Sequence, residues 1–468
     1  MDLSRFIPVD KSSAVRAFTF SLLTGSDVVI HIDGDLPEDV LSASKSLELF
    51  GKSLERDGGT FSVRGTASKP VCPVDCGNSA TLFHILMAVG LHFGWDLELM
   101  GDNSLMSRDH TVFYEASKLY RGGFVETSLA RESAQLKTFH LIAMLDHGGI
   151  LHFKRRTRRN TEELLKIMGA ELEEGENCLK ILPVSKLGGY DLRLSGDPSA
   201  AFIAACAAII CKVPFDIGGI YGEDLRLRPF DILRNLGYDL KISREGGTVS
   251  VSGLPKISKK AGTLKLSDGD VPEIIDEIPF IAFMAARAGT KFVLHGASWL
   301  RNKESDRISE SVRRFEPFFK SCEYDDGFEI AEKISNKYTG LPHSDDHRME
   351  MLSKLVALDY GVPFEADGSC AVSFPEFNGL IKELEKMYNK IQELRAELDE
   401  VDSKLASLLK RRVEIGRSIV AVKRSEGLPA DDFAREAAVL DRLSAENPEI
   451  APLLRELYGR IFSWVKTQ

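Results

Sequence analysis

The 468-residue sequence predicts an α/β protein that is followed by an all-α region. Up to about residue 378, short β-rich runs alternate with helical runs, which is typical of layered α/β folds. From residue 381 onward the strand signals vanish. There, apolar residues recur at intervals of three and four along one face of a long helix: Leu394, Leu398, Val401, Leu405 and Leu408. We place the boundary near residues 379–390.

The individual elements follow from local patterns. Strands are expected in the runs 27–33, 215–222, 247–253 and 291–296, which are rich in Val, Ile and Phe. Several helices are followed by a glycine that fits the C′ position, where positive φ is needed: Gly123, Gly169 and Gly237. Their irregular spacing indicates a repeated supersecondary unit and not a solenoid. In the tail, Gly427 and Pro429 should end the long helix, with further helices at about 432–445 and toward residue 468.

The bulk composition is that of a soluble globular protein, with 43% hydrophobic and 28% charged residues. No apolar run approaches the length that spans a bilayer, and the first residues resemble neither a secretory signal nor a transit peptide. The net charge of −10, without a long basic stripe, argues against nucleic-acid binding. Seven scattered cysteines suggest free thiols in a reducing compartment. We therefore expect a cytoplasmic protein without membrane or nucleic-acid partners.

Two short motifs stand before helices and could bind anions. In "DKSSAVR", Ser12 or Ser13 is expected to cap a helix whose free N–H groups lie near Lys11 and Arg16. In "GNSAT", the small residues 77–81 would let a ligand approach the backbone. A capped surface helix and a tight turn are the plainer interpretations of the same residues.

The stretch "LRNKESDRISE" gathers five charged side chains within residues 301–307. We expect Lys303 and Arg307 on one face of a helix, with Glu304 beside them. Upstream, Asp276 and Glu277 stand inside an apolar run, so a carboxylate there is expected to be buried or at a pocket edge, where its pKa can rise and it can act as a base. Downstream, "DHRM" places Arg348 before another apolar helix. Each cluster alone could instead be a solvated helix end.

Taken in order, these motifs resemble the enolpyruvyl transferases, and most closely the 5-enolpyruvylshikimate-3-phosphate (EPSP) synthases. The matching stretches are "DKSSAVR", "GNSAT", "GDNSLMSR", "ESAQLK", "SGDPSAAF", "IIDEIPFIA", "LRNKESDR", "DHRMEM" and "SFPEF". The resemblance implies two domains, each built of three repeated βαβαββ units around a cleft. The first domain would contain residues 11–198, and the second would contain residues 1–10 and 199–378.

The resemblance also implies site residues, without any metal or organic cofactor. Shikimate 3-phosphate and phosphoenolpyruvate would be the substrates, and Lys11 would contact both. Proton transfer would involve Lys11, Asp276, Lys303 and Glu304. Shikimate 3-phosphate would be bound with the help of Ser12, Arg16, Asn78, Ser133, Ala134, Gln135 and Arg158. Phosphoenolpyruvate would be bound by Arg108, Arg307 and Arg348.

Some positions depart from the family pattern. Ala80 stands where many members carry glycine. The stretches "GDNSLMSR" and "SAQ" resemble those of the glyphosate-tolerant members, so we expect reduced sensitivity to glyphosate. His84 replaces a common arginine, and Val372 stands where some members have a lysine. The sister activity on UDP-N-acetylglucosamine is the close alternative. It fits less well because that branch lacks the "KESDR" pattern.

In the tail, Arg412 and Lys423 lie eleven residues apart and share one face of a helix. Arg395 lies about 25 Å away along the same helix, so only a second, antiparallel copy could bring it to the same ligand. A dimerising coiled coil with solvated basic residues is the plainer alternative.

Residues 390–468 resemble the all-helical chorismate mutases, which are intertwined dimers of three-helix chains. The resemblance implies that chorismate is bound by Arg412 and the partner's Arg395, with Lys423 at the ether oxygen. Asp432, Arg435 and Glu436 would position the ring, and Gln468 would be a second ether-oxygen donor. We therefore expect a bifunctional shikimate-pathway enzyme that forms a homodimer through residues 379–468. The alternative is an EPSP synthase whose tail serves only dimerisation or ligand sensing.

Overall fold

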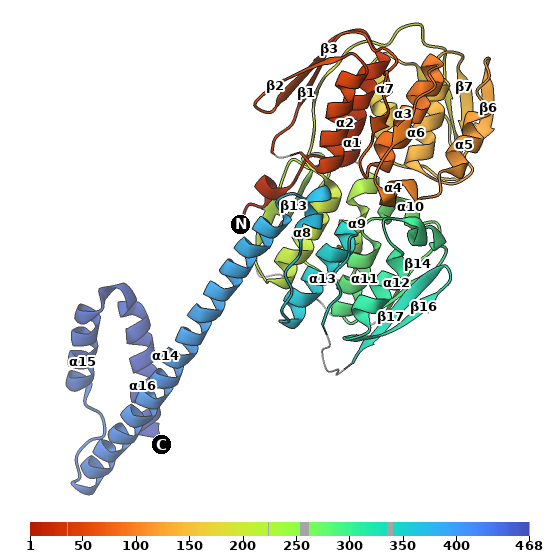
Figure 1. Cartoon of the computed structure of the whole chain (residues 1–468). Helices are drawn as coiled ribbons and strands as arrows, with labels where there is room; N and C mark the ends of the chain where they lie inside the picture. Colours follow the sequence, from red (N-terminus) through yellow and green to blue (C-terminus); the bar gives the residue numbers. More distant parts are fainter. Residues whose placement is uncertain (35, 223, 253–261, 335–339, 468) are drawn as a thin grey trace. The chain divides into compact units, whose positions relative to one another are not determined.

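The computed structural model describes residues 1–34, 36–222, 224–252, 262–334 and 340–467 (Figure 1). The chain forms two compact units, residues 1–386 and residues 387–468. The first unit is a mixed α/β structure and the second is all helical. The predicted fold class is therefore confirmed.

Three four-stranded sheets of the first unit share one topology, in which a parallel pair is extended by an antiparallel hairpin. In the chain, two of them read strand, helix, strand, helix, strand, strand, which is the expected βαβαββ repeat. Their orders are β10(Asp191–Arg193)-β1(Val28–His31)-β3(Thr60–Arg64)-β2(Ser53–Asp57), β6(Val125–Ser128)-β7(Gly149–His152)-β9(Cys178–Ile181)-β8(Leu172–Glu174) and β14(Thr263–Leu266)-β15(Lys291–Leu294)-β17(Gly327–Lys333)-β16(Phe319–Tyr324).

Two smaller sheets complete the set in the part of the chain that the structure describes. They are β11(Phe215–Ile217)-β13(Thr248–Val251)-β12(Lys241–Ser243) and β4(Val74–Asp75)-β5(Leu99–Met100). The N-terminal residues extend the first of these, because Asp2 forms a parallel bridge with Asp216 and the Leu3 N–H donates to the Asp216 carbonyl at 2.9 Å. The first ten residues thus pair with a strand that lies more than two hundred positions downstream.

The helices of the first unit pack beside one another between these sheets, with α3 against both α1 and α6 (Figure 1). They are α1(Lys11–Phe20), α2(Glu38–Leu49), α3(Ala80–Phe93), α4(Asn103–Met106), α5(Thr111–Ser117), α6(Ala134–Ala143), α7(Asn160–Ile167), α8(Pro198–Ile210), α9(Asp224–Asn235), α10(Val271–Ile274), α11(Ile278–Arg287), α12(Arg307–Phe315) and α13(His347–Tyr360). Short 3₁₀ helices lie at η1(Ser4–Phe6), η2(Ser21–Leu23), η3(Ser298–Asn302) and η4(Gly368–Val372).

One hydrophobic cluster of buried residues runs from Val9 to Leu194 and contains no residue beyond that range. A self-contained core of this length is what an independent domain requires. The first domain at residues 11–198 and the second at residues 1–10 and 199–378 stay predictions, and Val9 of this cluster lies just outside the first range.

The chain crosses twice between the two predicted domains, near residue 10 and near residue 198. The two crossing segments are hydrogen-bonded to each other. The Asp10 N–H donates to the Ser195 carbonyl, and the Asp197 N–H donates to the Pro8 carbonyl, both at 2.8 Å. Asp10 and Asp197 are also the N-caps of α1 and α8. The buried Arg226 guanidinium donates to both carboxylates, at 2.8 Å and 3.2 Å. One cation therefore joins both crossing segments.

Three local predictions were wrong. The cap of α1 is Asp10 and neither Ser12 nor Ser13, because the Asp10 carboxylate accepts from the Ser13 N–H at 2.8 Å. That helix end is thus already neutralised by a carboxylate. Lys303 and Arg307 do not share a helix, because η3 ends before Lys303 and α12 begins only at Arg307, after the Asp306 cap.

The third error concerns Gly123. It has φ +87°, but α5 already ends at Ser117, so this glycine belongs to a separate turn and is not a helix C′ residue. Gly169 and Gly237, with φ of +93° and +98°, do follow α7 and α9 directly.

The second unit consists of α14(Phe377–Ser425), which begins in the first unit, α15(Phe433–Glu446), η5(Pro448–Ile450) and α16(Ala451–Thr467). Its small core is formed by Val420, Ile461 and Val465. Along α14 the predicted apolar stripe is 47% to 65% exposed; it comprises Leu394, Leu398, Val401, Leu405 and Leu408. No helix among the described residues has the length and apolar character that crossing a membrane requires.

Candidate functional site

A cavity of about 230 Å³ in the first unit contains every site residue that the sequence predicts for residues 1–378. These residues come from segments spread over more than three hundred positions. They are Lys11, Ser12, Arg16, Asn78, Arg108, Ser133, Ala134, Gln135, Arg158, Asp276, Lys303, Glu304, Arg307 and Arg348. The fold therefore brings all of the candidates into one place.

The cavity is positively charged although the whole chain carries a net charge of −10. Nine Lys and Arg side chains line it, against six Asp and Glu side chains. An excess of cations in an enclosed site favours ligands with several negative charges. The cavity is therefore built for anions.

Asp276 lies at the centre of these charges, between α10 and α11. Its Oδ1 is 3.3 Å from Arg307, 3.7 Å from Lys303 and 3.9 Å from Arg348, and its Oδ2 is 3.4 Å from Arg158. Burial alone would raise the pKa of Asp276, as the sequence led us to expect, but that expectation is wrong because these four cations together hold the pKa well below its ordinary value. The carboxylate is therefore ionised at neutral pH and can accept a proton.

Arg307 links three carboxylates while its side chain is only 1% exposed. Its Nε donates to Asp346 at 2.8 Å, and its Nη2 donates to Glu304 at 2.5 Å. Asp346 is also the N-cap of α13, since it accepts from the Arg348 N–H at 2.9 Å. Arg307 thus fixes the start of the helix that carries Arg348.

The two lysines of the cavity differ in electrostatic surroundings. Burial lowers the pKa of Lys303, and Asp276 opposes this without cancelling it. For Lys11 the same burial is outweighed by Asp39, 2.9 Å from its Nζ, and by Glu304, so the pKa of Lys11 is raised. Lys303 is therefore the lysine that gives up a proton more readily.

Three helices hold Arg16 in place beneath the cavity. Its guanidinium donates to Thr161 at 2.9 Å and to Thr138 at 3.1 Å, and the two threonine hydroxyls share a hydrogen bond of 2.6 Å. Burial lowers the pKa of Arg16 to about 10. Arg16 of α1 is thus locked against α6 and α7.

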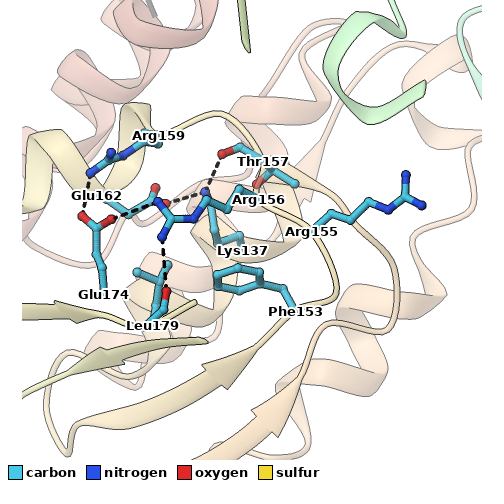
Figure 2. Close-up of a pocket in the computed structure, with 10 residues that line it drawn as sticks. Lys137, Phe153, Arg155, Arg156, Thr157, Arg159, Glu162, Glu174 and Leu179 are labelled. Carbon is cyan, nitrogen blue, oxygen red and sulfur yellow. Dashed lines mark hydrogen bonds and ion pairs between the residues drawn. The ribbon is translucent and has the colours of Figure 1, made fainter. Parts of the chain in front are cut away.

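Arg158 belongs to the basic loop, which we define as Lys154–Arg159. Figure 2 shows most of this loop, with Arg156 and Arg159 turned toward Glu174 and with Arg155 extending away from that group. Arg159 is 2.6 Å from Glu174, while Arg158 takes the other direction and reaches Asp276. The loop therefore divides its cations between a surface carboxylate and the cavity.

Several lining residues were not predicted from the sequence. Asp39 and Arg226 lie in ordinary amphipathic helices, so no local pattern distinguishes them from surface charges. His347 adjoins the predicted Arg348, and burial lowers its pKa to about 4. Only the position of His347 within the "DHRM" motif could have signalled it.

His84, the departure noted in the sequence, lies at the cavity wall. Its Nε2 is 2.9 Å from His110 Nδ1, its Nδ1 is 3.1 Å from Gln135, and its ring stacks on Phe113 at 3.5 Å. Burial, with a further contribution from His110, lowers the pKa of His84 to about 3. A neutral ring therefore stands here.

One group elsewhere has ligand atoms close enough for a metal ion. His343, Glu350 and Asp367 offer three such atoms within 4.8 Å of one another. The Glu350 carboxylate already accepts from His343 at 2.8 Å, from the Ser344 N–H at 3.0 Å and from the Asp367 N–H at 3.1 Å. Because internal donors satisfy that carboxylate, we assign no metal to the group.

In the second unit the candidate residues form two small groups. Lys423 is 3.3 Å from Asp432, which caps α15 by accepting from the Arg435 N–H. Glu436 is 2.7 Å from Lys466, a residue that the sequence analysis missed. Burial is slight in this region, so the charges are largely solvated.

Arg412 lies in the same unit, with its guanidinium 5.5 Å from the centre of the Phe462 ring. Arg395 is exposed on α14, and the structure records no contact between it and the other candidates within the described residues. Gln468 lies outside the described residues. Residues 387–468 therefore contain all of these candidates, but Arg395 has no recorded contact with Lys423, Asp432, Arg435, Glu436 or Arg412 among the described residues.

Comparison with known proteins gives a family for each unit. Residues 113–381 match the family model described as EPSP synthase (3-phosphoshikimate 1-carboxyvinyltransferase), and residues 394–468 match that of chorismate mutase type II. A 3-phosphoshikimate 1-carboxyvinyltransferase of Caulobacter vibrioides is 30% identical over 425 residues, covering 81% of this chain and 94% of its own. One of Limosilactobacillus fermentum is 29% identical over 408 residues, covering 79% and 94%.

Solved structures agree at the level of the fold. An EPSP synthase of Acinetobacter baumannii superimposes with a TM-score of 0.65 at 23% identity, covering 81% of this chain and 94% of that protein. The chain thus belongs to the EPSP synthase family and carries a chorismate mutase type II domain at residues 394–468, which makes it a bifunctional enzyme of the shikimate pathway.

Proposed function

We propose that the cavity of the first unit binds shikimate 3-phosphate and phosphoenolpyruvate together and transfers the enolpyruvyl group to the 5-hydroxyl. The observation that carries this proposal is the convergence of nine cations on one cavity in an acidic chain. Two substrates that each bear a carboxylate and a phosphate would repel each other strongly unless fixed cations offset their charge. The reaction releases phosphate, which the same cations can accept.

The proton transfers require a base for the 5-hydroxyl and an acid for the methylene carbon of phosphoenolpyruvate. Asp276 is the proposed base because it is an ionised carboxylate in contact with four cations of the cavity; these cations lower its pKa and weaken it as a base until the anionic groups of the substrates engage them. Lys303 is suited to donating, since burial lowers its pKa, while Glu304 lies beside it and Lys11 faces the same space. Arg16, Arg158, Ser133 and Gln135 would hold shikimate 3-phosphate. Arg108, Arg307 and Arg348 would hold phosphoenolpyruvate.

Phosphate release with both substrates tests this assignment. Asp276→Ala and Arg307→Ala should each lower kcat/KM at least about a hundredfold, because each removes a charge at the reacting atoms. Unchanged rates in both variants would discard the site.

We also propose that the helical unit rearranges chorismate to prephenate and that its site is completed by a second copy of the chain. The reaction needs no nucleophile, so fixed cations at the carboxylates and the ether oxygen suffice. Arg395 is exposed and lies about 25 Å from Arg412 along the same helix, α14, so it cannot reach a ligand held by Arg412 and Lys423 of its own chain. The exposed apolar stripe of that helix gives a second copy a surface to bury.

Co-expression of Arg395→Ala and Arg412→Ala chains separates this proposal from the alternative of a purely dimerising or sensing tail. Each variant alone should be inactive as a mutase. In a mixed population, half of the dimers contain one intact site, so about one quarter of the wild-type activity should return. A wild-type dimer that forms no prephenate would favour the alternative, and a lack of recovery would place Arg395 in its own chain's site.

A cytoplasmic location is proposed on the state of the cysteines. All seven are free thiols in the structure, as a reducing compartment permits. Cell fractionation followed by immunodetection tests this, and recovery in the membrane fraction or outside the cell would contradict it.

A further inference from the structure

Lys137 is a buried ammonium ion that the proposed chemistry does not use. It lies on α6, one turn after Ser133 and Ala134, and its side chain is only 4% exposed. Its Nζ donates to the Thr157 carbonyl at 3.2 Å, to the Arg158 carbonyl at 2.8 Å and to Glu162 at 2.5 Å. An ammonium group has three N–H donors, so these three acceptors satisfy it fully.

Two of the acceptors are consecutive carbonyls of the basic loop. Figure 2 shows Lys137 directed at Thr157 with Glu162 close by. Residues 156–159 form neither helix nor strand, and the convergence of two consecutive carbonyls on one ammonium ties the backbone there to one conformation, so Lys137 fixes how the chain turns at Arg158. That turn decides whether the Arg158 side chain enters the cavity, where it now lies 3.4 Å from Asp276.

The third acceptor makes the burial of this cation tolerable. The Glu162 side chain is 5% exposed, and the pair is neutral as a whole. The hydroxyl contact between Thr138 and Thr161, the neighbours of Lys137 and Glu162 in sequence, ties the same two helices. The contact of α6 with α7 therefore has a second support besides the ammonium, whereas both hydrogen bonds to the basic loop come from Lys137.

We propose that Lys137 is a positioning residue for shikimate 3-phosphate: it fixes the backbone at Thr157 and Arg158 and so aims the Arg158 guanidinium into the cavity. The inference rests on the proposed function, in which Arg158 contacts that substrate. Lys137 itself touches no substrate, and its effect passes through the loop.

The principal test is the full-length double variant Lys137→Met/Glu162→Gln. It removes both charges, so no unpaired ion stays buried, and it nearly preserves side-chain volume. The KM for shikimate 3-phosphate should rise about tenfold to a hundredfold through misplacement of Arg158. The KM for phosphoenolpyruvate should change less than about twofold, since Arg158 is not assigned to that substrate.

Lys52 provides a matched control. It is also a buried lysine whose ammonium donates to two carbonyls, those of Thr24 and Gly65, both at 2.6 Å, and it does not line the cavity. Lys52→Met should lower stability and leave the KM for shikimate 3-phosphate unchanged. An equal rise in that KM in both variants would show a general loss of structure and would overturn the proposal.

A double-mutant cycle with Arg158→Ala gives the decisive measurement. If Lys137 acts through Arg158, the Lys137→Met/Glu162→Gln change should raise the KM little further in the Arg158→Ala background. Additive effects would overturn the inference. If the double variant is insoluble, Lys137→Arg keeps the charge beside Glu162, but its planar fork cannot direct donors at all three acceptors. It should give a smaller rise of the same selective kind, and an unchanged KM would overturn the inference.

Failure of the proposed function is separable from failure of this inference. A wild-type chain that neither releases phosphate nor binds shikimate 3-phosphate would remove the function itself. A wild-type chain that does both, with Lys137 variants of normal KM, would remove only the role of Lys137.

Discussion

The two units present their candidate cations in opposite ways. In the first unit, Arg307 is 1% exposed and is in contact with three carboxylates before any substrate arrives. In the second, Arg395 is exposed and has no contact with the other candidates within the described residues. A buried charge needs an oppositely charged neighbour in its own chain, because an unpaired buried ion destabilises the fold. A solvated charge is stabilised by water and can stay unpaired until a second chain binds.

This difference indicates where the two sites obtain their preorganisation. The cavity is completed by segments of one chain, so its activity per chain should not depend on protein concentration. If a second copy supplies Arg395 to the helical site, as proposed above, mutase activity should follow the fraction of dimer. The predictions below bear on this contrast.

The largest effect is expected for Asp276→Asn. The substitution keeps the shape of the side chain but removes the charge that four cations surround, and loss of a general base costs on the order of a thousandfold in kcat. Phosphate release measures it, and prephenate formation by the same protein should stay normal. An exposed control is Asp268→Asn. A fall of less than about threefold would remove Asp276 from the reaction.

The next effect concerns the stripe on α14. Leu398→Glu combined with Leu405→Glu places charges on the surface that a second copy would bury, so the dimer should weaken by at least about a hundredfold. Sedimentation and prephenate formation at low protein concentration measure this. Phosphate release should be unaffected, and Ser403→Glu, on another face of the helix, is the control. Mutase activity in a monomeric variant would contradict the proposal that the helical site needs a second copy of the chain.

A smaller effect tests how finely the cavity discriminates. Ala80 begins α3 and lines the cavity, and the family pattern led us to expect reduced glyphosate sensitivity. Ala80→Gly removes one methyl group, which changes selectivity about tenfold in a closely fitted site. Inhibition of phosphate release by glyphosate should therefore become stronger. Equal inhibition of the wild-type and Ala80→Gly proteins would show that the Ala80 methyl group does not contact bound glyphosate.

The smallest effect is on stability against acid. Burial lowers the pKa of His84 to about 3 and that of His140 and His347 to about 4, against 6.5 for an ordinary histidine. Below pH 6.5 the unfolded chain takes up protons that the folded chain refuses, so stability falls as pH approaches 4. Residues 387–468 contain no histidine and should not share this loss.

Urea denaturation between pH 7.5 and 4.5, followed by circular dichroism, measures that loss. The substitution His140→Gln should flatten the dependence by up to about 1.4 kcal/mol per pH unit, since each histidine contributes one proton. The exposed His152 provides the control as His152→Gln. If residues 387–468 unfolded before the first unit on acidification, the buried histidines of the first unit would not be the cause of the acid sensitivity.

Sequence patterns were sufficient for the alternation of strands and helices and for the three-helix tail, because these depend on local periodicity. Motif resemblance named fourteen residues that the fold brings to one cavity. The exact helix starts were harder. Asp10, Ser12 and Ser13 are all favoured N-cap residues, and only the structure shows that Asp10 caps α1. The same carboxylate is held by Arg226, over two hundred residues away, and no local rule contains that partner.

The residues that sequence reasoning missed share one physical property. Asp39, Lys137 and Lys466 act through tertiary pairing, with Lys11, Glu162 and Glu436 respectively. On a helix surface such charges are indistinguishable from solvated ones until the neighbouring element is known. The separation of Lys303 from α12 was missed for a different, local reason: the Asp306 side chain caps the N-terminus of α12, so the helix begins only at Arg307.

The guanidinium of Arg226 that joins Asp10 to Asp197 has a consequence for biosynthesis. A ribosome delivers the chain from its N-terminus at about 5–20 residues per second. Residues up to about 198 can emerge from the ribosome and fold around their own core. The ion pairs of Asp10 and Asp197 with Arg226 cannot form until residue 226 has left the exit tunnel. During synthesis, the contact between the two crossing segments should therefore be completed late, when Arg226 becomes available to pair with Asp10 and Asp197.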